Sequence, residues 1–261
     1  MKSVYVGNRV VLVYDDGPGS DAMRYYLNAN DLRATPDVLQ GSYEPWAENL
    51  FDRLLKADQT VVDVGASFGY FTLMAADRVG KKGKVIAFEP SPVTSHLLRM
   101  NIETNGFATQ FNSRVMIVSK AVAAEIGEAE FWADFEFTEG SHLQKVGNHP
   151  ARNEGGVHTV PVTTLDEELA GMHIDVIKID VEGAEHLVWK GMQKIVTENP
   201  NIKLFVEFHR YQMSFEEADG LLHALEDRFN VCGRVEGSYD GLSTKQILDS
   251  PRSFLTCEPR Q

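Results

Sequence analysis

Short apolar runs alternate with segments of helical periodicity along most of the chain. Runs rich in β-branched and aromatic residues predict strands at 60–64, 84–88, 115–118, 174–180, 202–208, 231–235 and 253–257. Segments with one apolar face predict helices at 70–76, 92–101, 164–169, 181–191 and 215–229. Strands that alternate with helices indicate an α/β fold with a mainly parallel sheet, which a hairpin of the last two strands would close.

The N-terminal residues follow a different pattern. Alternation around Gly7-Asn8 predicts a β-hairpin, and a polar segment up to about Leu32 predicts a helix. A second helix is predicted over 47–55, where the apolar side chains fall on one face. We therefore expect an N-terminal cap over residues 1–50 and one main domain over residues 51–261.

The middle of the chain gives weaker signals. Residues 127–132 have the pattern of the return strand of a hairpin, and residues 160–162 that of an edge strand. Between them, residues 139–156 are polar and rich in glycine, with no core pattern. Such a segment is typical of a lid or substrate-binding loop, and equally of a disordered insertion.

Composition narrows the class of protein. Of the 261 residues, 43% are hydrophobic and 24% are charged, as in an ordinary globular chain. The formal charge of −13 repels nucleic-acid backbones and anionic membranes, and the basic stretch 81–84 is typical of a solvated turn. The negative charge therefore argues against a nucleic-acid partner. Because no run of about 18 apolar residues occurs, we also expect no membrane span.

The N-terminus and the cysteines bear on the cellular compartment. The first residues lack the apolar core of a signal peptide, which favours a cytoplasmic location. The two cysteines, Cys232 and Cys257, have no metal-site spacing, so we expect both to be reduced packing residues.

The segment 60–69, Thr-Val-Val-Asp-Val-Gly-Ala-Ser-Phe-Gly, is the strongest motif. A strand that runs through Gly65 and Gly69 into a helix gathers backbone N–H groups and the positive helix end. A ligand can also lie against the backbone where there is no Cβ. Asp63 adds a carboxylate beside this turn. We therefore expect a ligand with both an anionic and a cationic group, such as a nucleotide-linked amino acid.

Two other chemistries use a similar turn. Residues 65–69 also match the G-x-S-x-G nucleophile elbow of serine hydrolases, but few strands can precede it and the first histidine is His96. The nicotinamide fingerprint fits less well, because Ser67 and Tyr70 occupy its second and third glycine positions. Glu89 ends the next strand, about 20 residues beyond the turn, and this favours a ribose-binding site.

Four predicted strand ends carry acids: Asp63, Glu89, Asp180 and Glu207. In α/β sheets, ligands bind outside the carboxyl ends of the strands, so we expect these side chains to surround one site. Lys178 stands in an otherwise apolar strand. Since an unpaired buried ammonium is costly, we expect it to pair with a neighbouring acid.

Several segments together resemble the FkbM family of S-adenosylmethionine-dependent methyltransferases, whose members mostly methylate hydroxyls of sugars, glycolipids and polyketides. The matching segments are 43–45, 60–72, 85–90, 120–122, 127–131 and, most specific to the family, 175–185. The resemblance runs from about residue 41 to the C-terminus. Ser67-Phe68 departs from the usual Asn-Ile, and His186 from a more usual tyrosine. The resemblance implies a Rossmann-like seven-stranded methyltransferase sheet, mostly parallel with an antiparallel C-terminal strand.

The resemblance also implies S-adenosylmethionine as the cofactor and a hydroxyl of a small molecule or glycan as the acceptor. Asp63 would face the ammonium of the cofactor, and Glu89 would accept hydrogen bonds from both ribose hydroxyls. Thr72 would add a hydroxyl, and Ser91 and Ser119 would lie near the adenine. The implied cofactor residues are Tyr43, Glu44, Asp63, Gly65, Ala66, Ser67, Phe68, Gly69, Thr72, Glu89, Pro90, Ser91, Ser119 and Asp180. The alternatives are a non-catalytic S-adenosylmethionine-binding protein and a metal-dependent 2′-O- or N-methyltransferase.

Methyl transfer to an alcohol needs a group that takes the proton. The strand order of this class brings Asp180 and Glu182 close to Glu207 and His209, and these four are the catalytic candidates. His209 has the pKa best suited to a base, although a histidine at a strand end is often a hydrogen-bonded structural residue.

A divalent metal is a second hypothesis for the same region. The ligands would be Glu182, Glu185, His186 and His209, because Glu-x-x-Glu-His resembles the metal motif of small-RNA 2′-O-methyltransferases. Acids at a helix start equally complement the helix dipole.

Overall fold

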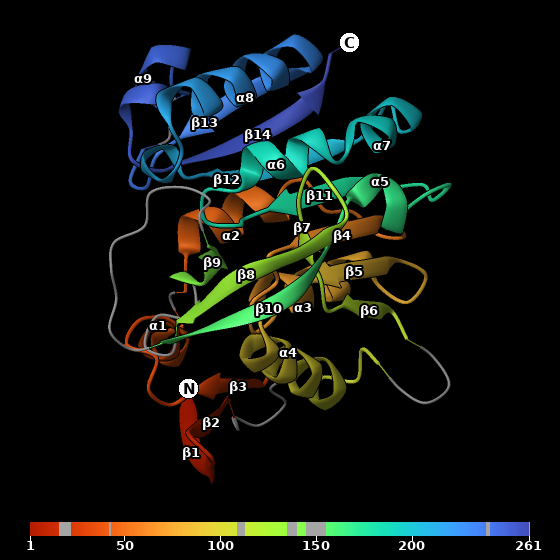
Figure 1. Cartoon of the computed structure of the whole chain (residues 1–261). Helices are drawn as coiled ribbons and strands as arrows, with labels where there is room; N and C mark the ends of the chain where they lie inside the picture. Colours follow the sequence, from red (N-terminus) through yellow and green to blue (C-terminus); the bar gives the residue numbers. More distant parts are fainter. Residues whose placement is uncertain are drawn as a thin grey trace.

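A seven-stranded sheet forms the centre of the protein (Figure 1). The computed structural model describes residues 1–15, 22–41, 43–108, 113–134, 140–144, 155–238 and 241–260. The sheet has the order β13-β14-β12-β11-β4-β5-β6. Its strands are β4 (Thr60–Val64), β5 (Lys84–Phe88), β6 (Val115–Val118), β11 (Val176–Ile179), β12 (Lys203–Phe208), β13 (Phe229–Arg234) and β14 (Ser253–Pro259). Neighbours pair in parallel except at β14, which is antiparallel to β12 and β13, and this confirms the predicted Rossmann-like α/β sheet.

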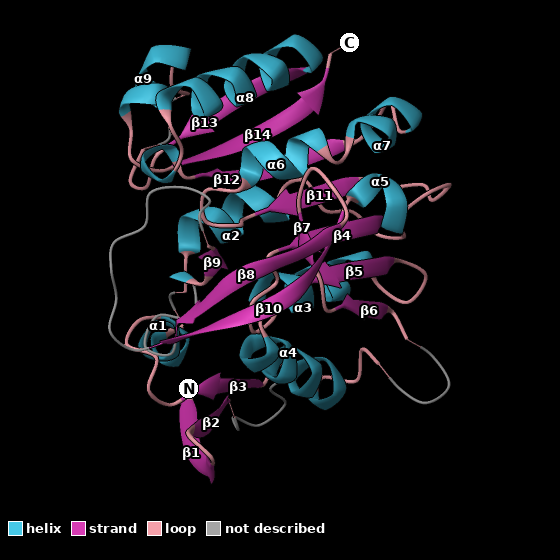
Figure 2. Cartoon of the chain, in the orientation of Figure 1, coloured by secondary structure: helices cyan, strands magenta, loops and turns pink. Residues whose placement is uncertain are grey.

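Helices cover both faces of this sheet (Figure 2). On one face lie α2 (Pro45–Asp52), α3 (Tyr70–Val79) and α4 (Pro92–Thr104). On the other lie α5 (Leu165–Glu168), α6 (Glu185–Lys190), α7 (Gln193–Glu198), α8 (Phe215–Arg228) and α9 (Thr244–Asp249). Consecutive strand residues therefore enter opposite cores, Val61 one and Val62 the other. This is why the strands appear in the sequence as continuous apolar runs.

Local signals set several helix ends. Pro92 opens α4, with Ser91 as its N-cap, and Ser214 and Glu217 form a capping box at the start of α8. The helix predicted from residue 181 begins later, at Glu185. The reason is a turn in which Glu182 and Gly183 have φ of 53° and 95°, values that an α-helix excludes. A short 3₁₀ helix, η2 (Arg210–Gln212), follows β12.

The N-terminal residues form a small antiparallel sheet of β1 (Lys2–Gly7), β2 (Val10–Tyr14) and β3 (Tyr25–Asn28), followed by α1 (Ala34–Gln40). The predicted hairpin is confirmed. The helix predicted up to Leu32 is wrong, because alternate burial of Tyr25 and Leu27 gives this stretch the pattern of a strand. Asn101 of α4 holds the cap by accepting from the Tyr26 N–H at 2.5 Å and donating to the Tyr26 carbonyl at 3.0 Å.

A second sheet, of four strands, adjoins the carboxyl ends of the central strands. Its order is β7 (Ala121–Val122), β10 (Gly155–Thr163), β8 (Gly127–Asp134) and β9 (His142–Leu143). Two predictions are wrong here: β8 is not the return of a local hairpin, and β10 lies between β7 and β8 rather than at an edge. β10 lies far from β7 and β8 in the sequence, and no local pattern pairs it with them. Within 139–156, residue 139 and residues 145–154 lie outside the described residues, so the choice between lid and insertion stays open.

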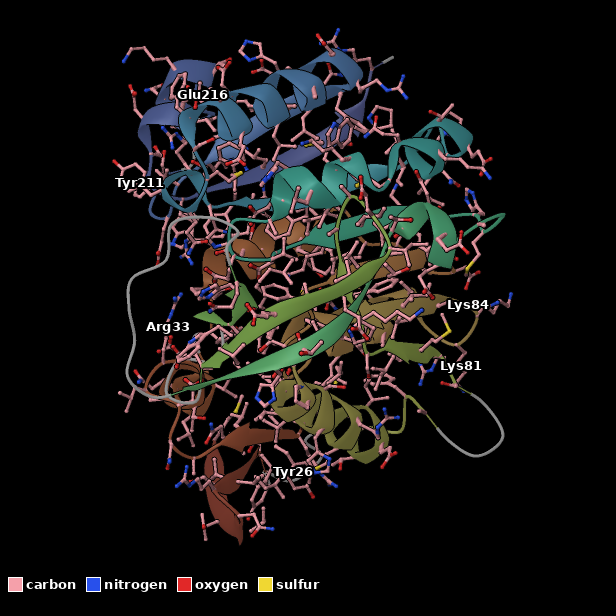
Figure 3. All side chains as sticks on the ribbon, viewed as in Figure 1. Tyr26, Arg33, Lys81, Lys84, Tyr211 and Glu216 are labelled. Carbon is pink, nitrogen blue, oxygen red and sulfur yellow. The ribbon has the colours of Figure 1, made fainter. Side chains whose placement is uncertain are left out.

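The basic stretch 81–84 lies at the start of β5, at the amino end of this strand. Lys81 and Lys84 are exposed and project outward from the turn before β5 (Figure 3), as predicted for a solvated turn. Within the described ranges, the structure contains no helix that is both long enough and apolar enough to cross a bilayer.

A buried ammonium joins two central strands. Nζ of Lys178 lies 3.4 Å from Oδ1 of Asp63 and 3.2 Å from Oδ2 of Asp180, and 4.9 Å from the centre of the Phe71 ring. Thr72 donates its hydroxyl to Asp63 at 2.6 Å. Burial by itself lowers the pKa of Lys178, but the carboxylates of Asp180 and Asp63 raise it above its usual value. The predicted pairing of Lys178 with an acid is thereby confirmed.

Replacing this ammonium should destabilise the fold. Lys178→Met leaves the carboxylate of Asp63 buried without its cation, so the free energy of unfolding should fall by about 3–5 kcal/mol. Urea denaturation at neutral pH measures this, with Lys194→Met, at an exposed ion pair, as the matched control. Equal stability of the two variants would contradict the central role of Lys178.

Candidate functional site

A cavity opens at the carboxyl ends of β4, β5 and β11, where the small sheet adjoins the central one. It encloses about 680 Å³ of space, its mouth included. The described residues that line it are Tyr43, Val64, Gly65, Ser67, Phe88, Glu89, Pro90, Lys120, Ala121, Val122, Phe131, Ser141, Leu143, Asp180, Val181, Glu182 and Ala184. The chain leaves β4 and β11 in connections to opposite faces of the sheet, so this is the switch point where such folds bind ligands.

The predicted cofactor residues divide into two groups. Those in the cavity wall are Tyr43, Gly65, Ser67, Glu89, Pro90 and Asp180. Those outside it are Glu44, Asp63, Ala66, Phe68, Gly69, Thr72, Ser91 and Ser119. Asp63 and Thr72 are fully buried and bonded to each other, so the structure presents neither of them to a ligand.

The glycine turn is shaped by contacts within the protein. The N–H groups of Gly65 and Ala66 both donate to the Phe88 carbonyl at 3.0 Å. A Cβ on Gly65 would lie 1.8 Å from the Asp180 carbonyl oxygen, and one on Gly69 would lie 2.5 Å from a Leu98 methyl. Because Gly65 and Gly69 have no Cβ, neighbouring protein atoms can pack against their backbone. The N–H groups of residues 65 and 66 already have hydrogen-bond partners within the protein.

Glu89 ends β5 and reaches back across the turn. Its carboxylate accepts from the Ser67 N–H at 2.7 Å, the Ser91 N–H at 2.8 Å and the Thr94 hydroxyl at 2.8 Å. Burial raises the pKa of Glu89 to about 6, while these hydrogen bonds act in the opposite direction. The ordered carboxylate in the cavity wall retains acceptor capacity for a ligand's hydroxyl groups.

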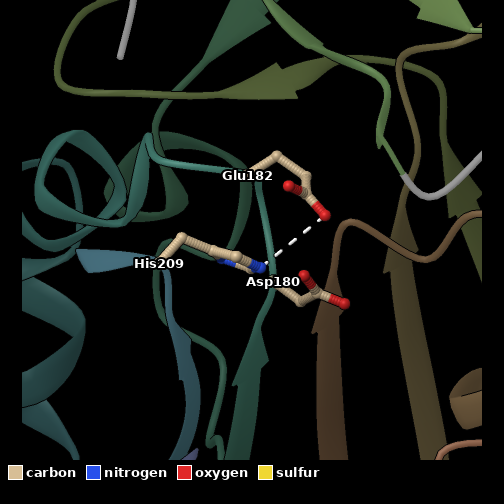
Figure 4. A group of neighbouring side chains, drawn as sticks. All are labelled: Asp180, Glu182 and His209. Atoms are coloured by element: carbon tan, nitrogen blue, oxygen red, sulfur yellow. Dashed lines mark ion pairs between the residues drawn. The ribbon is translucent and has the colours of Figure 1, made fainter. Parts of the chain in front are cut away.

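The acids after β11 meet His209, which follows β12 (Figure 4). Nε2 of His209 lies 3.6 Å from Oε1 of Glu182 and 3.3 Å from Oε1 of Glu207. Its Nδ1 lies 2.8 Å from Oε1 of Glu185. One oxygen each of Asp180 and Glu182 and one ring nitrogen of His209 lie within 4.8 Å of one another. The structure thus brings the four catalytic candidates together.

Burial and neighbouring charges shift the pKa values of the ionisable groups in this cluster. Burial alone lowers the pKa of His209, but Glu182, Glu185 and Glu207 raise it well above 6.5. Burial raises the pKa of Glu182 to about 7, despite the opposing charge of His209. Burial also raises the pKa of Asp180, with a contribution from Glu207. The neighbouring carboxylates therefore favour the protonated form of His209, and the raised pKa of Glu182 brings its titration near neutral pH.

Glu207 is the strong acid of this group. Burial would raise its pKa, but His209 and Arg252 lower it to about 2. Arg252 donates to Glu207 at 2.8 Å and to Glu44, in the N-terminal part of the chain, at 3.4 Å. Glu44 is also bonded to Arg33 at 3.1 Å. Glu44 and Glu207 are thus held by arginines rather than directed to the cavity.

The predicted metal ligands do not all assemble. His186 turns toward α8, where its Nε2 lies 3.3 Å from Glu217. Glu185 contacts Nδ1 of His209 and accepts from the Gly183 N–H at 3.1 Å. Of the predicted set, Glu182 and His209 face a common space, and Asp180 joins them there.

Sequence reasoning gave no site role to several residues in the cavity wall. Lys120, Ala121, Val122 and Phe131 belong to segments that carried the family resemblance, while Ser141 and Leu143 come from the glycine-rich stretch. Arg252 was missed as well. The pairing of β8 with β9 and β10 brings these residues to the cavity wall. In the sequence, the family resemblance was the only signal for any of them.

Solved structures of methyltransferases resemble this fold. The methyltransferase FkbM from Methylobacillus flagellatus is 18% identical, with a TM-score of 0.52 over 77% of this chain and 44% of that one. This chain therefore spans less than half the length of that protein. An rRNA methylase from Streptococcus thermophilus is 12% identical (TM-score 0.47; 83% of this chain, 95% of that one). A candidate methyltransferase from Streptococcus mutans, in complex with SAH, is 10% identical (TM-score 0.48; 83% and 97%).

The sequence itself matches a family model. The model of the methyltransferase FkbM domain matches residues 63–229, which include Glu89 and His209 with the acids around it. The match covers more than half of the chain and reaches from the end of β4 to the first residue of β13. The chain therefore belongs to the FkbM methyltransferase family.

Proposed function

We propose that this methyltransferase uses S-adenosylmethionine to methylate a hydroxyl group of a small molecule or glycan, such as a sugar, a glycolipid or a polyketide. One observation carries the proposal: Glu89, which suits a ribose, and Asp180 and Glu182, which suit a cationic group and proton transfer, line the same cavity. They stand at the carboxyl ends of β5 and β11, which flank β4 in the parallel part of the sheet, where this fold binds its ligands.

The cavity wall fits the parts of this cofactor. Glu89 offers a charged acceptor to the ribose hydroxyls. The Ser67 hydroxyl is buried in the wall and has no hydrogen-bond partner among the described residues, so it is free to bond to a ligand. Phe88 and Val122 provide apolar surface suited to a purine. Asp180 and Glu182 favour a positive charge nearby.

When bound, S-adenosylmethionine supplies a methyl group carried on a sulfonium sulfur. Transfer of this methyl group would leave the sulfur as a neutral thioether. Glu182 lines the cavity, and its pKa near 7 suits a base that takes the proton of an alcohol. His209 keeps its own proton between three carboxylates, so it stabilises the ionised form of Glu182. This assignment moves the base from His209, the sequence-based preference, to Glu182.

Glu89 should govern affinity for the cofactor. Loss of its carboxylate in Glu89→Gln should weaken binding of S-adenosylhomocysteine by about ten- to a hundredfold, on the order of 1.5–3 kcal/mol. Titration calorimetry measures this, and Glu216→Gln, an exposed acid on α8 (Figure 3), is the matched control. Binding of NADH without S-adenosylhomocysteine, or unchanged affinity in Glu89→Gln, would contradict the proposed site.

The same binding should depend on pH. The pKa of Glu89 is raised to about 6, so protonation below pH 6 removes the charged acceptor and affinity should fall as the pH decreases through this value. Calorimetry between pH 5 and pH 8 should show this inflection, and Glu89→Gln should lack it. Persistence of the inflection in Glu89→Gln would assign it to another group.

Glu182 should control the rate of methyl transfer. Because the base must be ionised, the rate should rise with pH through about 7, and Glu182→Gln should lower kcat by about 10²–10⁴. Transfer of a labelled methyl group to a panel of hydroxyl acceptors measures both effects. S-adenosylhomocysteine affinity, determined for the same variant, separates a defect in catalysis from one in binding. A Glu182→Gln variant with the parent's rate and pH profile would refute this role.

A further inference from the structure

The cluster around His209 holds more negative than positive charge. Among the described residues, Lys178 pairs with Asp63 and Asp180, and Arg252 pairs with Glu207 and Glu44. The carboxylates of Glu182 and Glu185 form their ion pairs with His209, which is a cation only when it is protonated. Buried charge of one sign is costly unless a cation compensates for it. A proton on Nε2 of His209 balances a single charge, whereas a divalent cation in place of that proton would balance two.

Three potential ligand atoms already surround one space. One oxygen of Asp180, one oxygen of Glu182 and a ring nitrogen of His209 lie within 4.8 Å of one another, and Figure 4 shows the three side chains facing a common space. An octahedral Mg²⁺ holds adjacent oxygens about 3 Å apart, so side-chain shifts on the order of 1 Å complete the set. The space adjoins the cavity, since Asp180 and Glu182 also line it.

The orientation of His209 suits a metal ligand. Glu185 is buried, and its Oε1 lies 2.8 Å from Nδ1 of His209, which directs Nε2 toward Glu182. A carboxylate that accepts from one ring nitrogen fixes the tautomer in which the other nitrogen has a free lone pair, as in many protein metal sites.

The two carboxylates are held by one oxygen each. Gln212 donates to Oε2 of Glu182 at 2.6 Å, and Lys178 donates to Oδ2 of Asp180 at 3.2 Å. The other oxygen of each group can therefore bind a cation. Glu182 is held in the left-handed region, with φ of 53°, which is costly for a residue with a side chain. This strained turn directs its carboxylate toward His209 rather than into the helix start.

We propose that Asp180, Glu182 and His209 bind one divalent cation of the Mg²⁺ or Mn²⁺ type. Two carboxylates and one imidazole suit a hard, six-coordinate cation better than a thiophilic one. Three protein ligands leave positions open for water and for an oxygen of the acceptor. The site differs from the set predicted from the sequence, because Asp180 takes the place of Glu185 and His186.

The consequence for catalysis rests on the proposed function. A cation at this place binds the acceptor hydroxyl and lowers its pKa, so that the proton passes to solvent. The acceptor oxygen then forms its bond to the methyl carbon, and the bond between this carbon and sulfur breaks, with the electron pair kept by sulfur. With this cation bound, Glu182 serves as its ligand, and the role of Glu182 as the base applies to the protein without the metal.

The test is direct binding of Mn²⁺ to the whole chain, stripped of metal with EDTA and free of cofactor. Loss of the paramagnetic resonance signal of aquated Mn²⁺, together with calorimetry, should show one site per chain. Asp180→Asn, Glu182→Gln and His209→Gln should each weaken this binding by about tenfold or more. Glu217→Gln, which removes one carboxylate on neighbouring α8, should bind as the parent does and controls for the loss of charge.

Thermal unfolding of each variant verifies that it is folded, and Glu182→Gln, at a partly exposed position, is the decisive one. Mn²⁺ affinity that is equal in the parent and in Glu182→Gln, or absent from both, would overturn the inference. Calorimetry with S-adenosylhomocysteine on the same samples separates the two proposals. Binding of this compound without a Mn²⁺ site overturns the metal site alone, whereas a Mn²⁺ site without it supports the metal and contradicts the proposed cofactor.

Discussion

The ion pair of Lys178 with Asp63 and Asp180 is the constraint on which the rest of the structure depends. It joins β4 to β11, the two strands between which the connections change face, and through Asp180 it reaches the cavity wall. A buried ammonium is tolerated only with such partners, so Asp63 serves the fold and Asp180 is oriented from below. The cavity wall can then combine Asp180 with Glu89, which is ordered separately by Ser67, Ser91 and Thr94.

A second set of ion pairs brings distant parts of the chain to the same place. Arg252 at the start of β14 reaches both Glu207 on β12 and Glu44 near the start of α2. The N-terminal cap shares its core with α3 and α4, and Asn101 bonds it to α4. The cap is thus part of the structure that shapes the cavity, to which it contributes Tyr43.

The charge distribution explains how one site combines binding with chemistry. Carboxylates bonded to backbone and hydroxyl donors, such as Glu89, act as fixed acceptors. Burial and the charges of Asp180 and Glu207 raise the pKa of Glu182, at the edge of the cavity, to about 7, so this group can take up and release a proton near neutral pH. His209 is enclosed by acids on both ring nitrogens. Because these carboxylates raise the pKa of His209, its protonated form is favoured and balances their charge.

The sequence by itself determined the central sheet and much of the site. Seven apolar strands, the glycine turn and the acids at Glu89, Asp180 and Glu207 are local patterns, because strand periodicity and turn chemistry act over a few residues. Only the tertiary structure decided what Asp63 pairs with, that His186 turns to Glu217 while Asp180 joins His209, and that β8 pairs with β9 and β10. Most of those contacts join residues far apart in the chain. Burial, which helps to set the charge states of the ionisable groups, exists only once the layers have packed.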